Sequence, residues 1–133
     1  MSKSHLESLF IALFDRTLVN LKAPAVPYER EYRFAAEHVG TGPGLRKRLD
    51  EAGLKDWRFD FAIVDQKLAI ECMGGEWVGG AHVKGAHYNS DCEKSNAATC
   101  LGWRILNFTG TMLKKDPAGC MADLAICLGI HKK

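Results

Sequence analysis

The chain has 133 residues, of which 47% are hydrophobic and 26% charged, a composition typical of one globular domain over residues 1–133. Its formal net charge of +2 is too small to indicate nucleic-acid binding by itself. No apolar run reaches the roughly 18 residues of a transmembrane helix, and the charged N-terminal segment lacks a signal-peptide cleavage site. We therefore expect a cytoplasmic protein with no membrane partner.

The cysteines point to the same compartment. All five are scattered and none forms a CxxC pair, which indicates reduced thiols rather than a disulfide framework. A zinc site built from His82, His87 and Cys92 is an alternative use of one of them, although their spacing matches no standard zinc motif.

The N-terminal segment is predicted to be an amphipathic helix. Ser4 followed by Glu7 is a capping-box pattern, which would start the helix at about residue 5. Apolar residues then recur at helical spacing as far as Leu21, and prolines a few residues later end the helix. A second, short helix is predicted over residues 29–38.

The most informative segment reads WRFDFAIVDQKLAIECMGGEW. Over residues 57–63 the odd positions are aromatic or aliphatic, while Arg58 and Asp60 occupy even positions. This alternation with period two predicts a strand, and residues 67–73 form a second strand by the same criterion. Only Asp65-Gln66 lies clearly between them, so the two strands are expected to form a hairpin.

The C-terminal half continues the alternation of strands and helices. A glycine-rich loop is predicted over residues 74–89, followed by a helix over residues 91–101 that Gly102 ends. Residues 103–108 form the third predicted strand, and Asp116-Pro117 opens a final helix. Together these elements predict an α/β fold with a mixed sheet.

The predicted hairpin brings two acids together. With a connection of two or four residues, Asp60 lies directly opposite Glu71, on the face that lacks the large aromatics. Like charges directly opposite across a strand pair repel by roughly 0.2–1 kcal/mol, and burial under helices raises the cost. A divalent cation between the carboxylates would reverse the sign of the interaction, because Mg²⁺ and similar ions prefer oxygen ligands. The alternative is that both acids merely face water, or that a three-residue loop places them on opposite faces.

Asp60, ten intervening residues and Glu71 at the end of an apolar strand resemble the core motif of the PD-(D/E)XK nuclease superfamily. The run GGEW…H…DCEKSNAA…GWRILNF is similar to small phage and prophage endonucleases and to the layout of the very-short-patch repair endonuclease, over about residues 28–113. The resemblance implies a restriction-endonuclease-like core, with a mixed sheet of about four strands flanked by helices. It also implies hydrolysis of phosphodiester bonds in DNA with Mg²⁺ or Mn²⁺, in repair, recombination or phage DNA processing.

The resemblance also implies a set of metal ligands. Asp60, Glu71 and the main-chain carbonyl of Cys72 would hold the metal, and a glutamate from the preceding helix often joins them. Glu31 is the best match for that glutamate, with a solvated helix acid as the alternative reading.

The chain departs from the motif two residues after Glu71, where a lysine is expected and Met73 stands. A thioether cannot orient a water molecule or stabilise an oxyanion. Lys94 is the first candidate for the missing cation, because it shares a helical face with residues expected to pack on the sheet. The alternative is a lysine that extends into water. His82 is the second catalytic candidate, and Asp91 would orient either one or complete the metal shell.

Basic and aromatic side chains around these acids are the predicted DNA contacts. Arg58, Lys84 and Arg104 would bind backbone phosphates. The basic cluster 46–48 is a further candidate, or else a solvated helix face. Trp77 would stack on an unpaired base or pack in the core.

RNA is an alternative substrate, and a homodimer would cut two strands. The rival to the enzyme is a catalytically inactive nucleic-acid-binding domain on the same fold, which Met73 favours.

Overall fold

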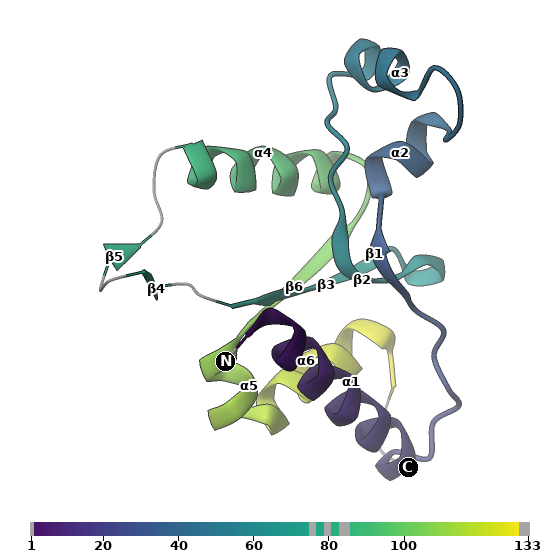
Figure 1. Cartoon of the computed structure of the whole chain (residues 1–133). Coiled ribbons are helices and arrows are strands. Elements are labelled where there is room, and N and C mark those ends of the chain that lie inside the picture. Colours follow the sequence, from purple (N-terminus) through teal and green to yellow (C-terminus); the bar gives the residue numbers. More distant parts are fainter. Residues whose placement is uncertain (1, 75–76, 79–80, 83–85, 131–133) are drawn as a thin grey trace.

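The computed structural model describes residues 2–74, 77–78, 81–82 and 86–130 (Figure 1). In chain order its elements are α1 (Lys3–Asn20), β1 (Glu29–Tyr32), α2 (Phe34–Val39), α3 (Leu45–Ala52), β2 (Phe59–Ile63), the 3-10 turn η1 (Val64–Gln66), β3 (Leu68–Met73), β4 (Trp77–Val78), β5 (Ala81–His82), α4 (Ala86–Cys100), β6 (Arg104–Thr109), α5 (Gly110–Lys115) and α6 (Pro117–Leu128). Within these ranges, no helix has the length and apolarity needed to cross a bilayer.

A four-stranded mixed sheet forms the centre, in the order β1-β2-β3-β6. The first three strands are antiparallel neighbours, and β6 runs parallel to β3 after the crossover through α4. The sequence-based prediction of an α/β fold with a mixed sheet of about four strands, flanked by helices, is therefore confirmed. The short strands β4 and β5 pair only with each other, within the segment predicted to be a loop.

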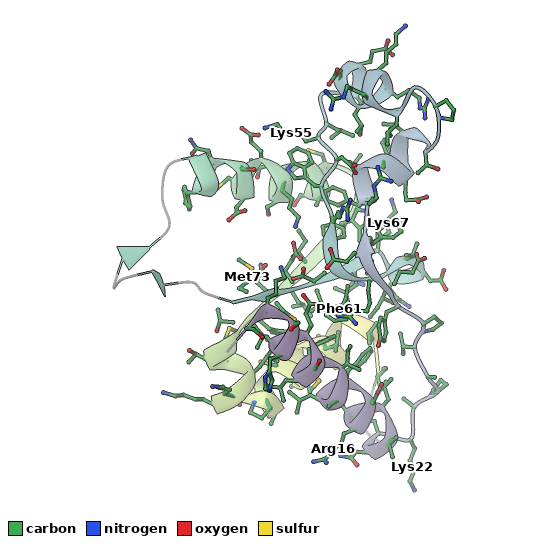
Figure 2. All side chains as sticks on the ribbon, in the orientation of Figure 1. Arg16, Lys22, Lys55, Phe61, Lys67 and Met73 are labelled. Atoms are coloured by element: carbon green, nitrogen blue, oxygen red, sulfur yellow. The ribbon has the colours of Figure 1, made fainter. Side chains whose placement is uncertain are left out.

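Helices cover both faces of this sheet (Figure 1). On one face α1, α5 and α6 bury an apolar cluster that includes Phe10, Phe61 and Phe108. On the other face α2, α3 and α4 cover a second cluster built around Phe59 and Trp103. Figure 2 shows Phe61 directed from the sheet towards α1, where its ring centroid lies 4.9 Å from that of Phe10. The strands β2 and β3, which carry Asp60 and Glu71, therefore lie between the two sets of helices.

The hairpin has the predicted register. Phe61 pairs with Ile70, Ala62 with Ala69 and Ile63 with Leu68, which places Asp60 opposite Glu71 at the next position. The connection contains four residues, Val64 to Lys67, and closes with Lys67 in the left-handed region at φ 48°. Period-two alternation and turn length were sufficient to specify this register because a one-residue slip would expose one of the two apolar sets.

The predicted start of α1 is wrong. The helix begins at Lys3, and the N-cap is Ser2, whose hydroxyl accepts a hydrogen bond from the His5 amide. Glu7 therefore does not close a capping box with Ser4. Its side chain is buried on the face that packs on the sheet, where it binds Arg30 instead.

The predicted helix over residues 29–38 is wrong in its first half. Glu29–Tyr32 is the edge strand β1, antiparallel to β2, and only Phe34–Val39 is helical. The strand β1 provides hydrogen-bond partners for the outer edge of β2, which a helix at residues 29–32 could not do. Tertiary context therefore overrides local propensity here. Glu31 consequently lies on a strand, with a positive φ of 50°, and not on a helix.

The remaining boundaries differ in smaller ways. Helix α4 begins at Ala86, five residues before the predicted start, and α5 was not predicted. The final helix begins at Pro117 as expected, and its N-cap Asp116 accepts a hydrogen bond from the Gly119 amide at 3.0 Å. None of these differences moves β2, β3 or β6.

Candidate functional site

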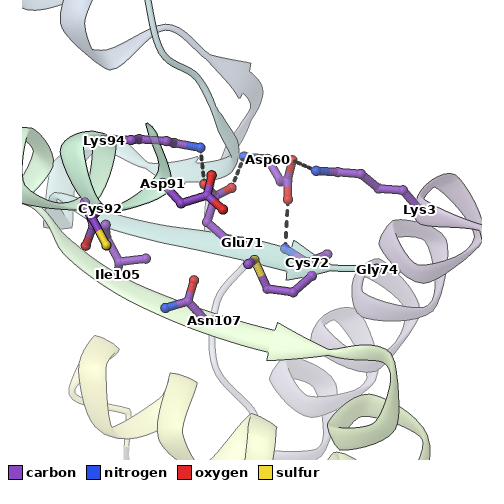
Figure 3. Close-up of a pocket in the computed structure, with 12 residues that line it drawn as sticks. Lys3, Asp60, Glu71, Cys72, Gly74, Asp91, Cys92, Lys94, Ile105 and Asn107 are labelled. Carbon is purple, nitrogen blue, oxygen red and sulfur yellow. Dashed lines mark hydrogen bonds and ion pairs between the residues drawn. The ribbon is translucent and has the colours of Figure 1, made fainter. Parts of the chain in front are cut away.

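An open cavity of about 420 Å³ lies beside the ends of β3 and β6, between α1 and α4 (Figure 3). Its wall includes three acids, Asp60, Glu71 and Asp91, and two lysines, Lys3 and Lys94. The acids come from β2, β3 and the first half of α4, and the lysines come from helices on opposite faces of the sheet. Residues distant in the sequence thus form one charged pocket.

The carboxylates of Asp60 and Glu71 each accept a hydrogen bond from a backbone amide of the other's strand. The Asp60 amide donates to Glu71 Oε2 at 2.9 Å, and the Cys72 amide donates to Asp60 Oδ2 at 2.8 Å. The last ladder pair before this point is Phe61 with Ile70. Because a buried backbone N–H needs an acceptor, each carboxylate takes the place of a strand partner and is held in a fixed orientation.

The second oxygen of each carboxylate faces a lysine (Figure 3). Lys3 Nζ lies 2.8 Å from Asp60 Oδ1. Lys94 Nζ forms an ion pair with Glu71 Oε1 and also lies 5.7 Å from the centroid of the Phe59 ring. Each carboxylate therefore has one oxygen fixed by the backbone and one oxygen neutralised by a side-chain cation.

Burial makes the negative charges of the two carboxylates costly, because little water reaches them. Asp60 is 6% exposed and Glu71 is 8% exposed. Desolvation raises the pKa of the Glu71 carboxyl above its ordinary value, although the charge and hydrogen bond of Lys94 oppose the shift. Burial lowers the pKa of the Lys3 ammonium, but the hydrogen bond and charge of Asp60 outweigh it and raise that pKa overall. Two poorly hydrated carboxylates depend here on nearby positive charge.

A further acid joins Asp60 from the α1 side. One carboxylate oxygen from each of Glu7, Glu31 and Asp60 lies within 4.8 Å of the others, which is close enough to share a metal ion. Glu7 is 6% exposed and accepts a hydrogen bond from Arg30 at 2.7 Å. Asp60 is thus the common member of two acidic groups, one with Glu71 and one with Glu7 and Glu31.

Sequence reasoning missed Glu7 because its spacing to Ser4 suggested a helix cap. The available signal was its place in the apolar stripe of the helix, between Leu6 and Phe10. A carboxylate at a buried position of an otherwise apolar stripe needs a charged partner, and this is the feature that could have identified it.

The residues present fit a hard divalent cation. Carboxylate oxygens are the ligands that Mg²⁺ and Mn²⁺ prefer. Among the described side chains here, five acids against three cations leave a formal charge of −2, which one divalent ion would balance. These groups are the acids Glu7, Glu31, Asp60, Glu71 and Asp91 and the cations Lys3, Arg30 and Lys94.

Other predicted site residues also lie at the cavity. The Cys72 backbone is adjacent to Asp60, whereas its thiol belongs to the apolar core, where burial raises its pKa to about 12. Asp91 lines the cavity (Figure 3). Met73, which stands where the motif has lysine, lines the cavity at 40% exposure.

The arginines that were predicted to bind DNA do not line the cavity. Arg104 lies at the opposite end of β6 and donates to the carbonyl oxygens of Gln66 and Cys127, at 3.2 and 3.0 Å. Arg48, in the basic cluster 46–48, donates to carbonyl oxygens in the preceding loop. Arg58 is exposed immediately before β2, two residues from Asp60. Arg48 and Arg104 therefore bind main-chain carbonyls of the fold.

Several predictions lie outside the described residues. Lys84 belongs to this group, and for Trp77 and His82 only the backbone positions in β4 and β5 are described. The predicted stacking of Trp77, the catalytic role of His82 and the zinc site with His87 accordingly stay predictions.

Comparison with known proteins does not assign the chain to a family. No protein-family model, curated protein or solved structure matches it. What the chain does must therefore be inferred from the chemistry of the cavity, above all from the paired carboxylates Asp60 and Glu71.

Proposed function

We propose that this protein is a metal-dependent endonuclease on a restriction-endonuclease-like fold, which hydrolyses phosphodiester bonds in DNA. The observation that carries the proposal is the pair of cross-strand hydrogen bonds in which Glu71 accepts the Asp60 amide and Asp60 accepts the Cys72 amide. Two nearly buried carboxylates on adjacent antiparallel strands are oriented by backbone amides and turn their remaining oxygens towards an open cavity. Such an arrangement stabilises the fold only when positive charge is supplied to it.

The acids of the cavity would hold Mg²⁺ or Mn²⁺. Asp60 and Glu71 are the proposed ligands, together with the Cys72 carbonyl and either Glu31 or Glu7 from the neighbouring acidic group. When bound, the ion supplies a Lewis acid that polarises the phosphate and lowers the pKa of a water molecule. The contribution of the chain is to fix the two carboxylates before the ion arrives, because their inner oxygens are already held by amides.

Lys94 is the proposed replacement for the motif lysine. Its ammonium lies at Glu71 Oε1 and over the Phe59 ring, so it is held near the position where charge develops on a bound phosphate. Met73 cannot perform this task. The first half of α4 also brings Asp91 to the cavity, where its carboxylate would orient Lys94 or an attacking water.

The substrate is proposed to be recognised by its shape, in repair, recombination or phage DNA processing. Phosphate contacts position a nuclease but carry no sequence information. Arg58 is a candidate for one such contact, because it is exposed next to the strand that carries Asp60.

Cleavage of supercoiled plasmid and branched DNA with Mg²⁺, with Mn²⁺ and with EDTA tests the proposal. We expect nicking with either metal, none in EDTA, and loss of nicking in Asp60→Asn. Asp65→Asn is the matched control, because Asp65 is an exposed acid in the turn of the same hairpin. Nicking in EDTA, or an Asp60→Asn variant as active as the parent, would rule out this chemistry.

Met73 supports one second candidate, a catalytically inactive nucleic-acid-binding domain. The exposed thioether lines the cavity where the motif requires a cation. Binding of branched DNA without cleavage under any metal condition would favour this second function.

A further inference from the structure

We propose that Lys3 is a displaceable counter-ion of Asp60, which a divalent cation releases from the carboxylate and which then binds a phosphate of the nucleic-acid substrate. The inference rests on the proposed function and extends it, since it makes metal binding and substrate binding cooperative. Lys3 thereby becomes a substrate-binding residue that no sequence motif indicates.

The first step in the argument is the position of the Lys3 ammonium. It lies 2.8 Å from Asp60 Oδ1, while the other oxygen of Asp60 accepts the Cys72 amide at 2.8 Å. The oxygen next to Lys3 is therefore the one whose partner can be exchanged without breaking a backbone hydrogen bond. A metal ion bound to Asp60 at this oxygen would compete directly with Lys3.

The second step is the difference between the two lysines. The Lys3 side chain is 57% exposed and extends from the first turn of α1. The Lys94 side chain is 23% exposed, extends from the interior of α4 and also lies over the Phe59 ring. Rehydration of a half-exposed ammonium on a flexible stem costs little, and the incoming cation replaces the positive charge that the buried Asp60 carboxylate loses. Lys3 is therefore the cation that leaves.

The third step is the destination of the released ammonium. Lys3 lines the open cavity in which a bound phosphate would lie (Figure 3). A lysine ammonium is a mobile point charge with three donors, which suits a phosphate oxygen without a fixed geometry. While Lys3 is paired with Asp60 its charge is offset by the carboxylate and attracts a phosphate only weakly, so the metal and the substrate each favour the arrangement that the other requires. Coupling of this kind is reciprocal.

Metal binding in the absence of DNA tests the displacement. Titration calorimetry with Mn²⁺ would compare the parent protein with Lys3→Met, Lys3→Arg and Lys55→Met. We expect Lys3→Met to bind Mn²⁺ about threefold to tenfold more tightly, the effect of removing one half-exposed competing cation. Lys3→Arg keeps the charge and should not bind Mn²⁺ more tightly. Lys55 pairs with Glu93 at similar exposure, outside the wall of the cavity, and Lys55→Met should leave the affinity unchanged.

The salt dependence of DNA binding tests the transfer to phosphate. Anisotropy of a labelled DNA flap would be measured against salt concentration, in Ca²⁺ and in EDTA. In Ca²⁺ the slope of log Kd against log salt should be smaller by about one for Lys3→Met than for the parent, as expected for one lost phosphate contact. In EDTA the two slopes should agree, because Lys3 is then bound to Asp60.

Each outcome decides a separate part of the proposal. Equal or weaker Mn²⁺ binding by Lys3→Met would overturn the displacement. A slope difference of the same size in EDTA and in Ca²⁺, or none in either, would overturn the transfer. If the folded parent protein, checked by circular dichroism, binds no DNA under any condition, the proposed function and the phosphate contact both fail, while the Mn²⁺ titration still decides whether Lys3 competes for Asp60.

Discussion

The two sides of the cavity carry the same pair of groups, a lysine and a carboxylate, in different surroundings. On the α1 side Lys3 pairs with Asp60 from a side chain that is 57% exposed. On the α4 side Lys94 pairs with Glu71 from a side chain that is 23% exposed and also contacts Phe59. The chemistry of the partners is identical, so differences in behaviour between the two sides must come from burial and from the neighbouring groups.

The difference in burial suits Lys3 and Lys94 to different roles. An ammonium that is well packed holds one position and can stabilise charge that develops nearby, because it needs no reorganisation during the reaction. An ammonium that is half exposed exchanges partners at little cost. Under the proposed nuclease function, in which Met73 stands at the position of a catalytic lysine, the work of that lysine would be divided between one fixed and one exchangeable cation.

The largest expected effect is that of Lys94→Met on cleavage. Removal of a preorganised charge next to the reacting phosphate should lower the single-turnover rate by about 10²–10³-fold. Lys3→Met should lower the rate by no more than about tenfold at saturating DNA, because its contribution is made on binding. Lys55→Met serves as the control and should cleave like the parent. A larger loss for Lys3→Met than for Lys94→Met would reverse the comparison between the two sides.

The region around Glu71 was accessible from the sequence, because its determinants are local. Alternating apolar residues and a short connection define the register that places Asp60 opposite Glu71. The helical spacing that joins Lys94 to the apolar face of α4 is a local pattern too, and Lys94 lies at the cavity wall.

The region around Asp60 was less accessible, because its partners are defined by tertiary packing. Lys3 and Glu7 reach the site only because α1 packs on the sheet, and Glu31 reaches it because β1 pairs with β2. Local rules indicated a helix cap for Glu7 and a helix for Glu31. Glu7 instead pairs with Arg30 of β1, and the segment that contains Glu31 pairs with β2 as a strand. The charged partners of Asp60 therefore could not be predicted from local sequence patterns and became evident only in the structure.

A smaller effect should separate the acids on the α1 side. Glu7→Gln should weaken Mn²⁺ binding about threefold to tenfold if Glu7 is a ligand, since one carboxylate of several is lost. Glu31→Gln should have a weaker effect, because Glu31 is exposed and its carboxylate can hydrate. Titration calorimetry measures both, with Glu51→Gln, an exposed acid of α3, as the control. Stronger dependence on Glu31 than on Glu7 would show that the edge strand, and not α1, supplies the additional ligand.

The smallest expected effect concerns the Glu71 side and the pH. Because burial raises the pKa of Glu71 in the folded chain above its ordinary value of 4.5, the folded state binds this proton more readily than the unfolded state does. The free energy of unfolding should therefore rise as the pH falls through the raised pKa towards 4.5. Glu71→Gln removes the titrating group and should lack this contribution, while its amide oxygen can still accept the Asp60 amide.

Urea unfolding of the metal-free protein in EDTA, repeated across this pH range, isolates the contribution as the difference between the parent and Glu71→Gln. Saturating Mn²⁺ should abolish the gain on acidification, because a bound cation favours the ionised carboxylate and reverses the direction of the pKa shift. If the difference between the two proteins keeps the same slope with and without Mn²⁺, Glu71 does not bind the ion. In that case the acidic site would contain only the carboxylates on the α1 side, and Lys94 would be a structural partner of Glu71.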